Sequence, residues 1–272
     1  PLGQQVDDLA GKHSNTQIPK ILGCARIYEL TGDDHMDKIE TFFWNAVTGH
    51  HSYAPGGNGN YEYFGPADKL SDQLSDNTME TCPTYNMLKL TNHLFSLYPS
   101  AHLMDYYEKA LYNHILATED HETQMTKNGE IPDRNVYFTS LRMGGKKQYQ
   151  SPFDDFTCCI GTGMENPVKY GESIYFHGRD GSLYINLFIP SILNWEEKGI
   201  IVRQETNLPK DDKVDLTITA KTPTQFLIHI RKPYWAFKGV QVMVNGKLQK
   251  VSADSDGYIT LNRTWKDKDH IE

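Results

Sequence analysis

Apolar residues in the first part of the chain, up to about residue 177, repeat with the period of an α-helix. Ile18, Leu22, Ala25 and Tyr28 fall on one helical face, and Thr31-Gly32-Asp33 is a typical helix end. The same spacing predicts further helices at 36–47, 87–97, 103–115 and, opened by Gly161-Thr162-Gly163, at about 161–176. The first two thirds of the chain are therefore expected to be helical.

Two long stretches interrupt this pattern. Residues 50–79 and about 121–160 have no regular period, and the first is rich in glycine and asparagine around Pro55. Loops of this length inside compact domains are usually functional or disordered. We therefore expect the chemistry of the protein in these two loops.

After Gly181 the apolar period changes to two, which is typical of half-buried strands. Turn sequences such as Asn245-Gly246 and Asp256-Gly257 separate these short runs. Strands are predicted at 183–189, 199–206, 213–220, 224–231, 240–245 and 257–262. Helices followed by strands predict an α + β protein of two domains, a helical one over residues 1–178 and an antiparallel β-sandwich over 179–272.

Composition and charge exclude several classes of protein. The 272 residues are 38% hydrophobic, with a net charge of −8 and a pI near 5.8. An acidic surface argues against nucleic acid as the main partner. No run of about 18 apolar residues is present, so we expect no membrane-spanning helix. The chain is expected to be a soluble globular protein.

The ends of the sequence predict a fragment. The chain begins at Pro1 without an apolar signal segment, and it stops at Ile271-Glu272 inside an expected strand. The compartment and the oligomeric state therefore cannot be inferred from the sequence.

The four cysteines are too few for a disulfide framework in a chain of this length. Cys24 lies in an apolar helical stretch and is expected to be a buried thiol. Glu80, Cys82, Cys158 and Cys159 together offer four donors, the number that a tetrahedral Zn²⁺ takes. The spacing lacks the C-x₂-C pairs of structural zinc sites, so buried, unconnected cysteines are the alternative interpretation.

Further candidates lie in or near the loops. Glu62 stands between aromatic residues in a glycine-rich loop, where desolvation favours the protonated form that a general acid needs; a solvated loop glutamate is the alternative. His13 precedes a helix and, as a lone histidine, is interpreted as a helix cap or a surface residue in preference to a ligand. Aromatic residues near the loops, such as Tyr137, suit sugar binding but also suit core packing.

Six segments, in order along nearly the whole chain, resemble the zinc-dependent β-L-arabinofuranosidases of glycoside hydrolase families 127 and 146. They are residues 13–20 (HSNTQIPK), 56–64 (GGNGNYEYF), 80–90 (ETCPTYNMLKL), 106–116 (YYEKALYNHIL), 158–165 (CCIGTGME) and 183–189 (LYINLFI). The resemblance implies an (α/α)₆ toroid followed by β-sandwich domains. The toroid of the family also uses a long N-terminal segment that has no counterpart here, so residues 1–178 would be its C-terminal part.

The resemblance also implies roles for individual residues. Zn²⁺ would be held by Glu80, Cys82, Cys158 and Cys159, with Cys158 also the nucleophile. Glu62 would be the general acid/base. The sugar contacts would include His13, Glu108 and Tyr137.

Two interpretations of different class follow from these observations. One is a retaining exo-glycosidase that removes β-L-arabinofuranosyl residues from plant-type glycans, with a zinc-bound thiolate as its nucleophile. The other is a non-catalytic, zinc-stabilised fragment or carbohydrate-binding relative with an incomplete active site. The first is favoured by the presence of the reacting groups, the second by the missing N-terminal half.

Overall fold

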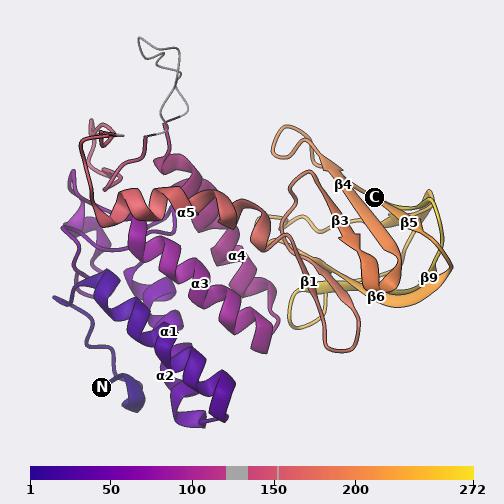
Figure 1. The fold of residues 1–272 in the computed structure, drawn as a ribbon, viewed down its shortest axis with the longest axis horizontal. Helices are drawn as coiled ribbons and strands as arrows, with labels where there is room; N and C mark the ends of the chain where they lie inside the picture. Colours follow the sequence, from indigo (N-terminus) through magenta and orange to yellow (C-terminus); the bar gives the residue numbers. More distant parts are fainter. Residues whose placement is uncertain (121–133, 152) are drawn as a thin grey trace. The chain divides into compact units, whose positions relative to one another are not determined.

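The computed structural model of the protein describes residues 1–120, 134–151 and 153–272 (Figure 1). They form two compact units. The first contains Pro1–Tyr98 and Tyr106–Tyr170, and the second contains Pro99–Asp105 and Gly171–Glu272. The predicted α + β class is confirmed, because helices build the first unit and sheets build most of the second. Part of the predicted loop at about 121–160 lies outside the described residues.

The helices follow the predicted order along the chain. They are α1 (Ser14–Thr31), α2 (Asp34–Ala46), α3 (Thr81–Leu97), α4 (Ala101–Ala110) and α5 (Cys158–Glu172), and π-helical turns at Val47–His51 and Leu111–Ile115 extend α2 and α4. Among the described residues, no helix combines the length and the apolar character that crossing a membrane requires.

Local sequence explains where the first two helices begin and end. α1 ends at Thr31, and the next residue, Gly32, has a φ of 70°, a left-handed conformation that suits glycine. The side chain of Asp33 then accepts a hydrogen bond from the backbone of His35 and caps α2. α1 packs against both α2 and α3 (Figure 1). Ile18, Phe43 and other apolar side chains of these helices are fully buried and form the core.

The last helix differs from the prediction at both ends. It begins at Cys158, not at Gly161, because the Thr157 hydroxyl accepts the backbone N–H of Ile160 at 3.3 Å and caps the helix there. It ends at Glu172, and the segment predicted to continue it forms a strand instead. Strand pairing with a neighbour overrides the weak helical period at that point.

The strands are short and form two sheets. They are β1 (Tyr175–His177), β2 (Leu183–Ile185), β3 (Ser191–Trp195), β4 (Ile200–Thr206), β5 (Val214–Ala220), β6 (Thr224–Arg231), β7 (Met243–Val244), β8 (Lys247–Leu248), β9 (Tyr258–Trp265) and β10 (Asp269–Ile271). Within the described residues, one sheet has the order β1-β2-β6-β9 and the other the order β3-β4-β5-β10-β7-β8. The predicted turn at Asn245-Gly246 joins β7 to β8, with φ of 50° and 73°.

The prediction of a purely antiparallel arrangement is wrong at one pair. β2 lies parallel to β6, with Leu183 opposite Ile228. The predicted strand at 183–189 is also shorter, since β2 ends at Ile185. Strands β1, β3 and β8 were not predicted from the period-two pattern, whereas the strand expected at Ile271 corresponds to β10. A strand of two or three residues, such as β8 or β1, is too short to show that pattern clearly.

Side chains from both sheets share one apolar core. Leu183 and Ile228 come from the four-stranded sheet, and Val202 and Ile218 come from the six-stranded sheet. All four are at most 1% exposed. Alternating inward and outward positions, as in β4, explain the period-two pattern of the sequence.

Candidate metal centre

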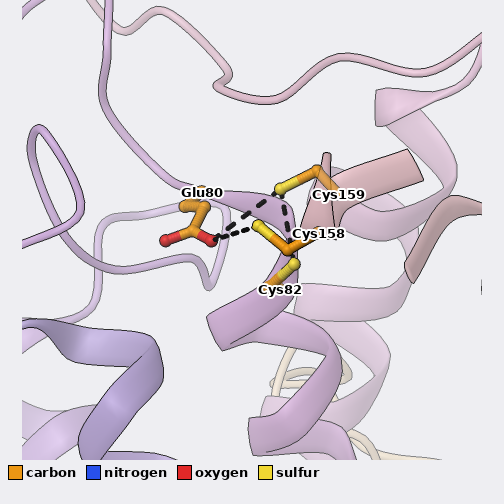
Figure 2. Close-up of side chains that lie close together, drawn as sticks. All are labelled: Glu80, Cys82, Cys158 and Cys159. Atoms are coloured by element: carbon orange, nitrogen blue, oxygen red, sulfur yellow. Dashed lines mark hydrogen bonds between the residues drawn. The ribbon is translucent and has the colours of Figure 1, made fainter. Parts of the chain in front are cut away.

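The first turns of two helices, α3 and α5, carry the four predicted metal-binding side chains. Glu80 is the residue before α3, and Cys82 is the second residue of that helix. Cys158 and Cys159 are the first two residues of α5. Although 75 residues or more separate the two helix starts along the chain, Figure 2 shows the four side chains gathered in one place.

A short extended segment around Asn135 holds the two helix starts together. The Thr81 hydroxyl donates to the carbonyl of Val136 at 3.0 Å, and the Thr81 N–H donates to the carbonyl of Tyr137 at 3.2 Å. The Asn135 side-chain amide donates to the carbonyl of Cys159 at 2.5 Å. These bonds fix α3 and α5 to the same strand-like segment, and they thereby fix the spacing between their ligand side chains.

The four side chains are close enough to share one cation. One potential ligand atom from each lies within 4.8 Å of those of the others. The Cys82 and Cys159 sulfurs are 3.4 Å apart, and Glu80 Oε1 is 3.8 Å from both Cys158 Sγ and Cys159 Sγ (Figure 2). Glu80, Cys82 and Cys159 are buried, whereas Cys158 is exposed. Three ligands are thus shielded from solvent and one sulfur is accessible.

Crowding of acidic groups controls the protonation of the cluster. Burial, and then the nearby Cys82, raise the pKa of the Glu80 carboxyl to about 8. The hydrogen bond between the Cys82 and Cys159 sulfurs, together with Thr162, lowers the pKa of Cys82 to about 6, and the same bond raises the pKa of Cys159. Like charges this close cannot all ionise on their own, but a divalent cation removes the penalty.

Helix geometry favours thiolates at these positions. The first turn of an α-helix carries a partial positive charge and unpaired N–H groups. Cys82 lies in the first turn of α3, and Cys158 and Cys159 lie in that of α5. Thiols at helix N-termini ionise more readily than free thiols. The arrangement therefore suits a soft, thiolate-binding cation, and the group of four residues could bind a metal ion.

The predicted acid/base, Glu62, lies beside the cluster. The Tyr137 hydroxyl donates to the Glu62 carboxylate, and Cys158 Sγ lies 3.4 Å from the same hydroxyl. His13 Nε2 is 3.7 Å from the other carboxylate oxygen of Glu62. One phenol oxygen therefore contacts both the candidate acid and the exposed sulfur.

Glu62 has an unusual backbone conformation. Its φ of 71° lies in the left-handed region, which is costly for a residue other than glycine. The Ser14 N–H and hydroxyl both donate to the Glu62 carbonyl, at 2.8 and 3.1 Å, and hold it there. Strain of this kind is concentrated at functional sites, and it directs the Glu62 side chain toward His13 and Tyr137.

The structure brings together most of the predicted site residues. Glu62, His13 and Tyr137 adjoin the cluster through the contacts described above. Glu108 lies on α4 and is only 8% exposed, and its role as a sugar contact stays a prediction. Cys24 is only partly buried in α1, not fully buried as predicted, and it is not one of the four clustered residues.

Sequence reasoning missed two polar residues that support the cluster. Thr162 Oγ1 lies 2.8 Å from Cys82 Sγ, and Asn135 contacts the backbone of Cys159 as described above. Thr162 follows Cys158 by four residues, one helical turn. A helix predicted to begin at Cys158 would have placed Thr162 on the same helical face as Cys158. Because the predicted helix began at Gly161, this relation between the two residues was not recognised. No local signal in the sequence indicates the role of Asn135.

Comparisons with known proteins agree with this geometry. A family model described as the β-L-arabinofuranosidase GH127 catalytic domain matches residues 1–172, and one described as the GH127 middle domain matches residues 182–272. A search of curated proteins found no match.

Solved structures share the fold of the chain. A GH127 β-L-arabinofuranosidase from Geobacillus stearothermophilus T6 is 22% identical, with a TM-score of 0.79, and the match covers 100% of this chain and 43% of that one. A second GH127 β-arabinofuranosidase is 23% identical, with a TM-score of 0.78 and the same coverage. The chain thus spans less than half the length of these two proteins.

Proposed function

The chain belongs to the GH127 β-L-arabinofuranosidase family of glycoside hydrolases, and on that premise we propose that it carries the reacting groups of a retaining exo-glycosidase. The proposed substrates are β-L-arabinofuranosides of plant-type glycans. The observation that carries the proposal is the Tyr137 hydroxyl, which contacts both Glu62 and the exposed sulfur of Cys158.

The proposal includes the architecture that the family resemblance implies. Residues 1–178 would form the C-terminal part of an (α/α)₆ barrel, and residues 179–272 would form a β-sandwich. The fold similarity to GH127 structures and the shared core of the two sheets support this division.

The donor set fits a zinc ion. Three thiols and one carboxylate give the four ligands of a tetrahedral site, and sulfur-rich sites favour zinc over harder cations. Glu80 Oε2 is buried and has no hydrogen-bond partner among the described residues, so it is available to a cation. When bound, zinc keeps the cysteine sulfurs deprotonated and makes the sulfur of Cys158 a better leaving group.

Glu62 and Cys158 then divide the chemistry between them. Protonated Glu62 gives its proton to the glycosidic oxygen as the C–O bond breaks, while the Cys158 sulfur attacks the anomeric carbon. Glu62, now a carboxylate, accepts a proton from water, which attacks the same carbon and returns the bonding electrons to sulfur. A phenol oxygen that contacts both groups is compatible with the separation of about 5–5.5 Å that retaining glycosidases use.

The surrounding residues orient the acid and the sugar. Tyr137 donates to one oxygen of Glu62, and His13 faces the other. These contacts leave Glu62 few orientations, which reduces the entropic cost of reaching the reactive geometry. We further propose that His13, Glu108 and Tyr137 contact the bound sugar, as the family resemblance implies.

A non-catalytic function is the second candidate. The chain spans 43% of the length of the GH127 structures that it matches. A zinc-stabilised, carbohydrate-binding fragment would keep the metal cluster but would not turn over substrate.

Hydrolysis of a chromogenic β-L-arabinofuranoside by four purified proteins separates the two functions. The wild type should release the chromophore. Cys158→Ser and Glu62→Gln should each lower kcat/KM by at least about 100-fold, because each removes a reacting group. Cys24→Ser, at a thiol outside the cluster, is the matched control and should retain wild-type activity.

Added nucleophiles distinguish the two roles. On a substrate with a good leaving group, azide should partly restore turnover to a Glu62 variant and give a glycosyl azide of retained configuration, because it intercepts the covalent intermediate. Any azide product of Cys158→Ser should have inverted configuration, because that variant forms no such intermediate. Turnover at the wild-type rate in either variant would refute the assigned roles. A folded, zinc-loaded wild type that binds the sugar without hydrolysis would favour the second function.

A further inference from the structure

Thr162 has a contact that the proposed reaction does not use. Its hydroxyl oxygen lies 2.8 Å from Cys82 Sγ and 3.1 Å from the carbonyl oxygen of Cys158, one helical turn earlier in α5. The side chain therefore connects the ligand sulfur on α3 with the backbone of the nucleophile on α5.

Thr162 contacts a cysteine sulfur in addition to the usual hydrogen-bond partner of a threonine inside a helix. The usual partner of such a hydroxyl is the carbonyl four residues earlier, as in the bonds from Thr91 to Met87 and from Thr48 to Trp44. Thr162 has this partner and, in addition, a sulfur at shorter range. A hydroxyl has a single hydrogen, so Thr162 can donate to only one of the two acceptors at a time.

The chemistry of a metal-bound cysteine decides which acceptor receives the hydrogen. A coordinating thiolate has no proton to donate. At 2.8 Å, an oxygen lone pair directed at an anionic sulfur would be repulsive, whereas an O–H donor would be attractive. The Cys158 carbonyl does not depend on Thr162, because it can accept a backbone N–H within α5.

We propose that Thr162 is a positioning residue that donates its hydrogen to the Cys82 thiolate when the zinc site is filled. The proposal rests on the proposed function, because it requires a zinc–thiolate centre. Outer-shell donors of this kind orient a ligand and tune how strongly it binds the metal.

The donor makes the three sulfurs unequal. Thr162 withdraws charge from Cys82, whereas the phenol beside Cys158 donates its hydrogen to Glu62 instead. Cys159 Sγ is buried and lies 3.8 Å from the carbonyl of Tyr137, which cannot donate. The Cys158 sulfur is therefore exposed to solvent and keeps more negative charge than the Cys82 sulfur. We infer that Thr162 helps to keep Cys82 a ligand while Cys158 is the sulfur that reacts.

Metal binding by four purified proteins tests the proposal without an activity assay. Thr162→Val removes the hydroxyl at nearly constant shape, and Thr162→Ser retains it. Thr48→Val is the matched control, because Thr48 is similarly half-buried and bonds only a helix carbonyl among the described contacts. The zinc dissociation constant is measured by competition with a chromophoric chelator, and the thiolate-to-metal charge-transfer band is measured after cobalt(II) substitution.

Thr162→Val should bind zinc about 10–100-fold more weakly than the wild type. Its cobalt(II) charge-transfer band should move to longer wavelength, because an unbonded thiolate gives up electrons more easily. Thr162→Ser and Thr48→Val should match the wild type in both measurements. If circular dichroism shows that valine disturbs α5, Thr162→Ala removes the same hydroxyl and has the same expected result.

The outcomes separate this inference from the proposed function. Wild-type affinity and an unshifted band in both Thr162→Val and Thr162→Ala would overturn the role of Thr162 and leave the zinc site intact. An equal loss of affinity in Thr48→Val would also overturn it, as a general effect of helix destabilisation. A wild type that binds neither metal would overturn the proposed function, and this inference with it.

Discussion

Glu40 on α2 is a buried acid outside the metal centre. Its side chain is fully buried, and neither carboxylate oxygen has a hydrogen-bond partner among the described residues. Burial, with the nearby Asp37 and Glu29, raises the pKa of Glu40 to about 7 from a usual value of 4.5. The folded protein therefore favours the protonated form, whereas the unfolded chain ionises at lower pH.

This difference predicts a pH-dependent stability. Because the pKa of Glu40 is higher in the folded state, protonated Glu40 makes its full contribution to the free energy of unfolding below pH 4.5. This contribution decreases as the pH rises toward 7. Glu40→Gln cannot ionise at this position. The free energy of unfolding of this variant minus that of the wild type should therefore be about 1–3 kcal/mol larger at pH 8 than at pH 5. Urea denaturation at the two pH values measures this change.

An exposed glutamate provides the comparison. Glu197 lies on the surface, and Glu197→Gln should alter the free energy of unfolding by less than about 0.5 kcal/mol at either pH. The account of Glu40 would be wrong if Glu40→Gln and the wild type differed by the same amount at pH 5 and at pH 8.

At the scale of elements, a buried ion pair joins a strand to a helix within the second unit. Arg231, at the end of β6, is fully buried and forms a salt bridge with Asp105 in the middle of α4. Its Nε also donates to the carbonyl of Asn186 at 2.6 Å. Through Arg231, the short segment Pro99–Asp105 is connected to β6 within the second unit.

Removing this cation should destabilise the second unit. Arg231→Met keeps much of the side-chain volume but deprives the Asp105 carboxylate of its counter-charge, at a cost of about 3 kcal/mol in the free energy of unfolding. Arg203→Met on the exposed face of β4 should cost less than about 0.5 kcal/mol. Urea denaturation of both variants checks this, and equal stability of the two would contradict the assigned role of Arg231.

The elements also show how far the sequence could predict the fold. Strong apolar periods located α1 to α4, and Gly32 marked the end of α1 correctly. The predicted start of α5 was wrong, because Gly161 and Gly163 resemble a helix boundary. The hydroxyl of Thr157 caps the helix, which therefore begins at Cys158. The parallel pairing of β2 with β6 depends on contacts between distant segments, which a local pattern cannot show.

At the scale of the whole molecule, the candidate site depends on contacts between segments far apart in the chain. Glu62, Cys82, Tyr137 and Cys158 come from four separate segments of the first unit. Residue types and spacing suggested a metal cluster, but on spacing alone buried, unconnected cysteines were the favoured interpretation. The family resemblance named the four side chains that the structure brings together, because it contains information on tertiary structure. Thr162 and Asn135 are not part of that resemblance, and only the folded structure identified them.

The central claim is that Glu80, Cys82, Cys158 and Cys159 bind one zinc ion. The direct test is the zinc content of folded, purified protein after zinc loading and removal of loosely bound metal, measured by mass spectrometry for the wild type, Cys82→Ser and Cys24→Ser. The wild type and Cys24→Ser should each contain about one zinc per chain, and Cys82→Ser should contain much less. A folded wild type without zinc, or a Cys82→Ser variant that retains all of it, would contradict the account.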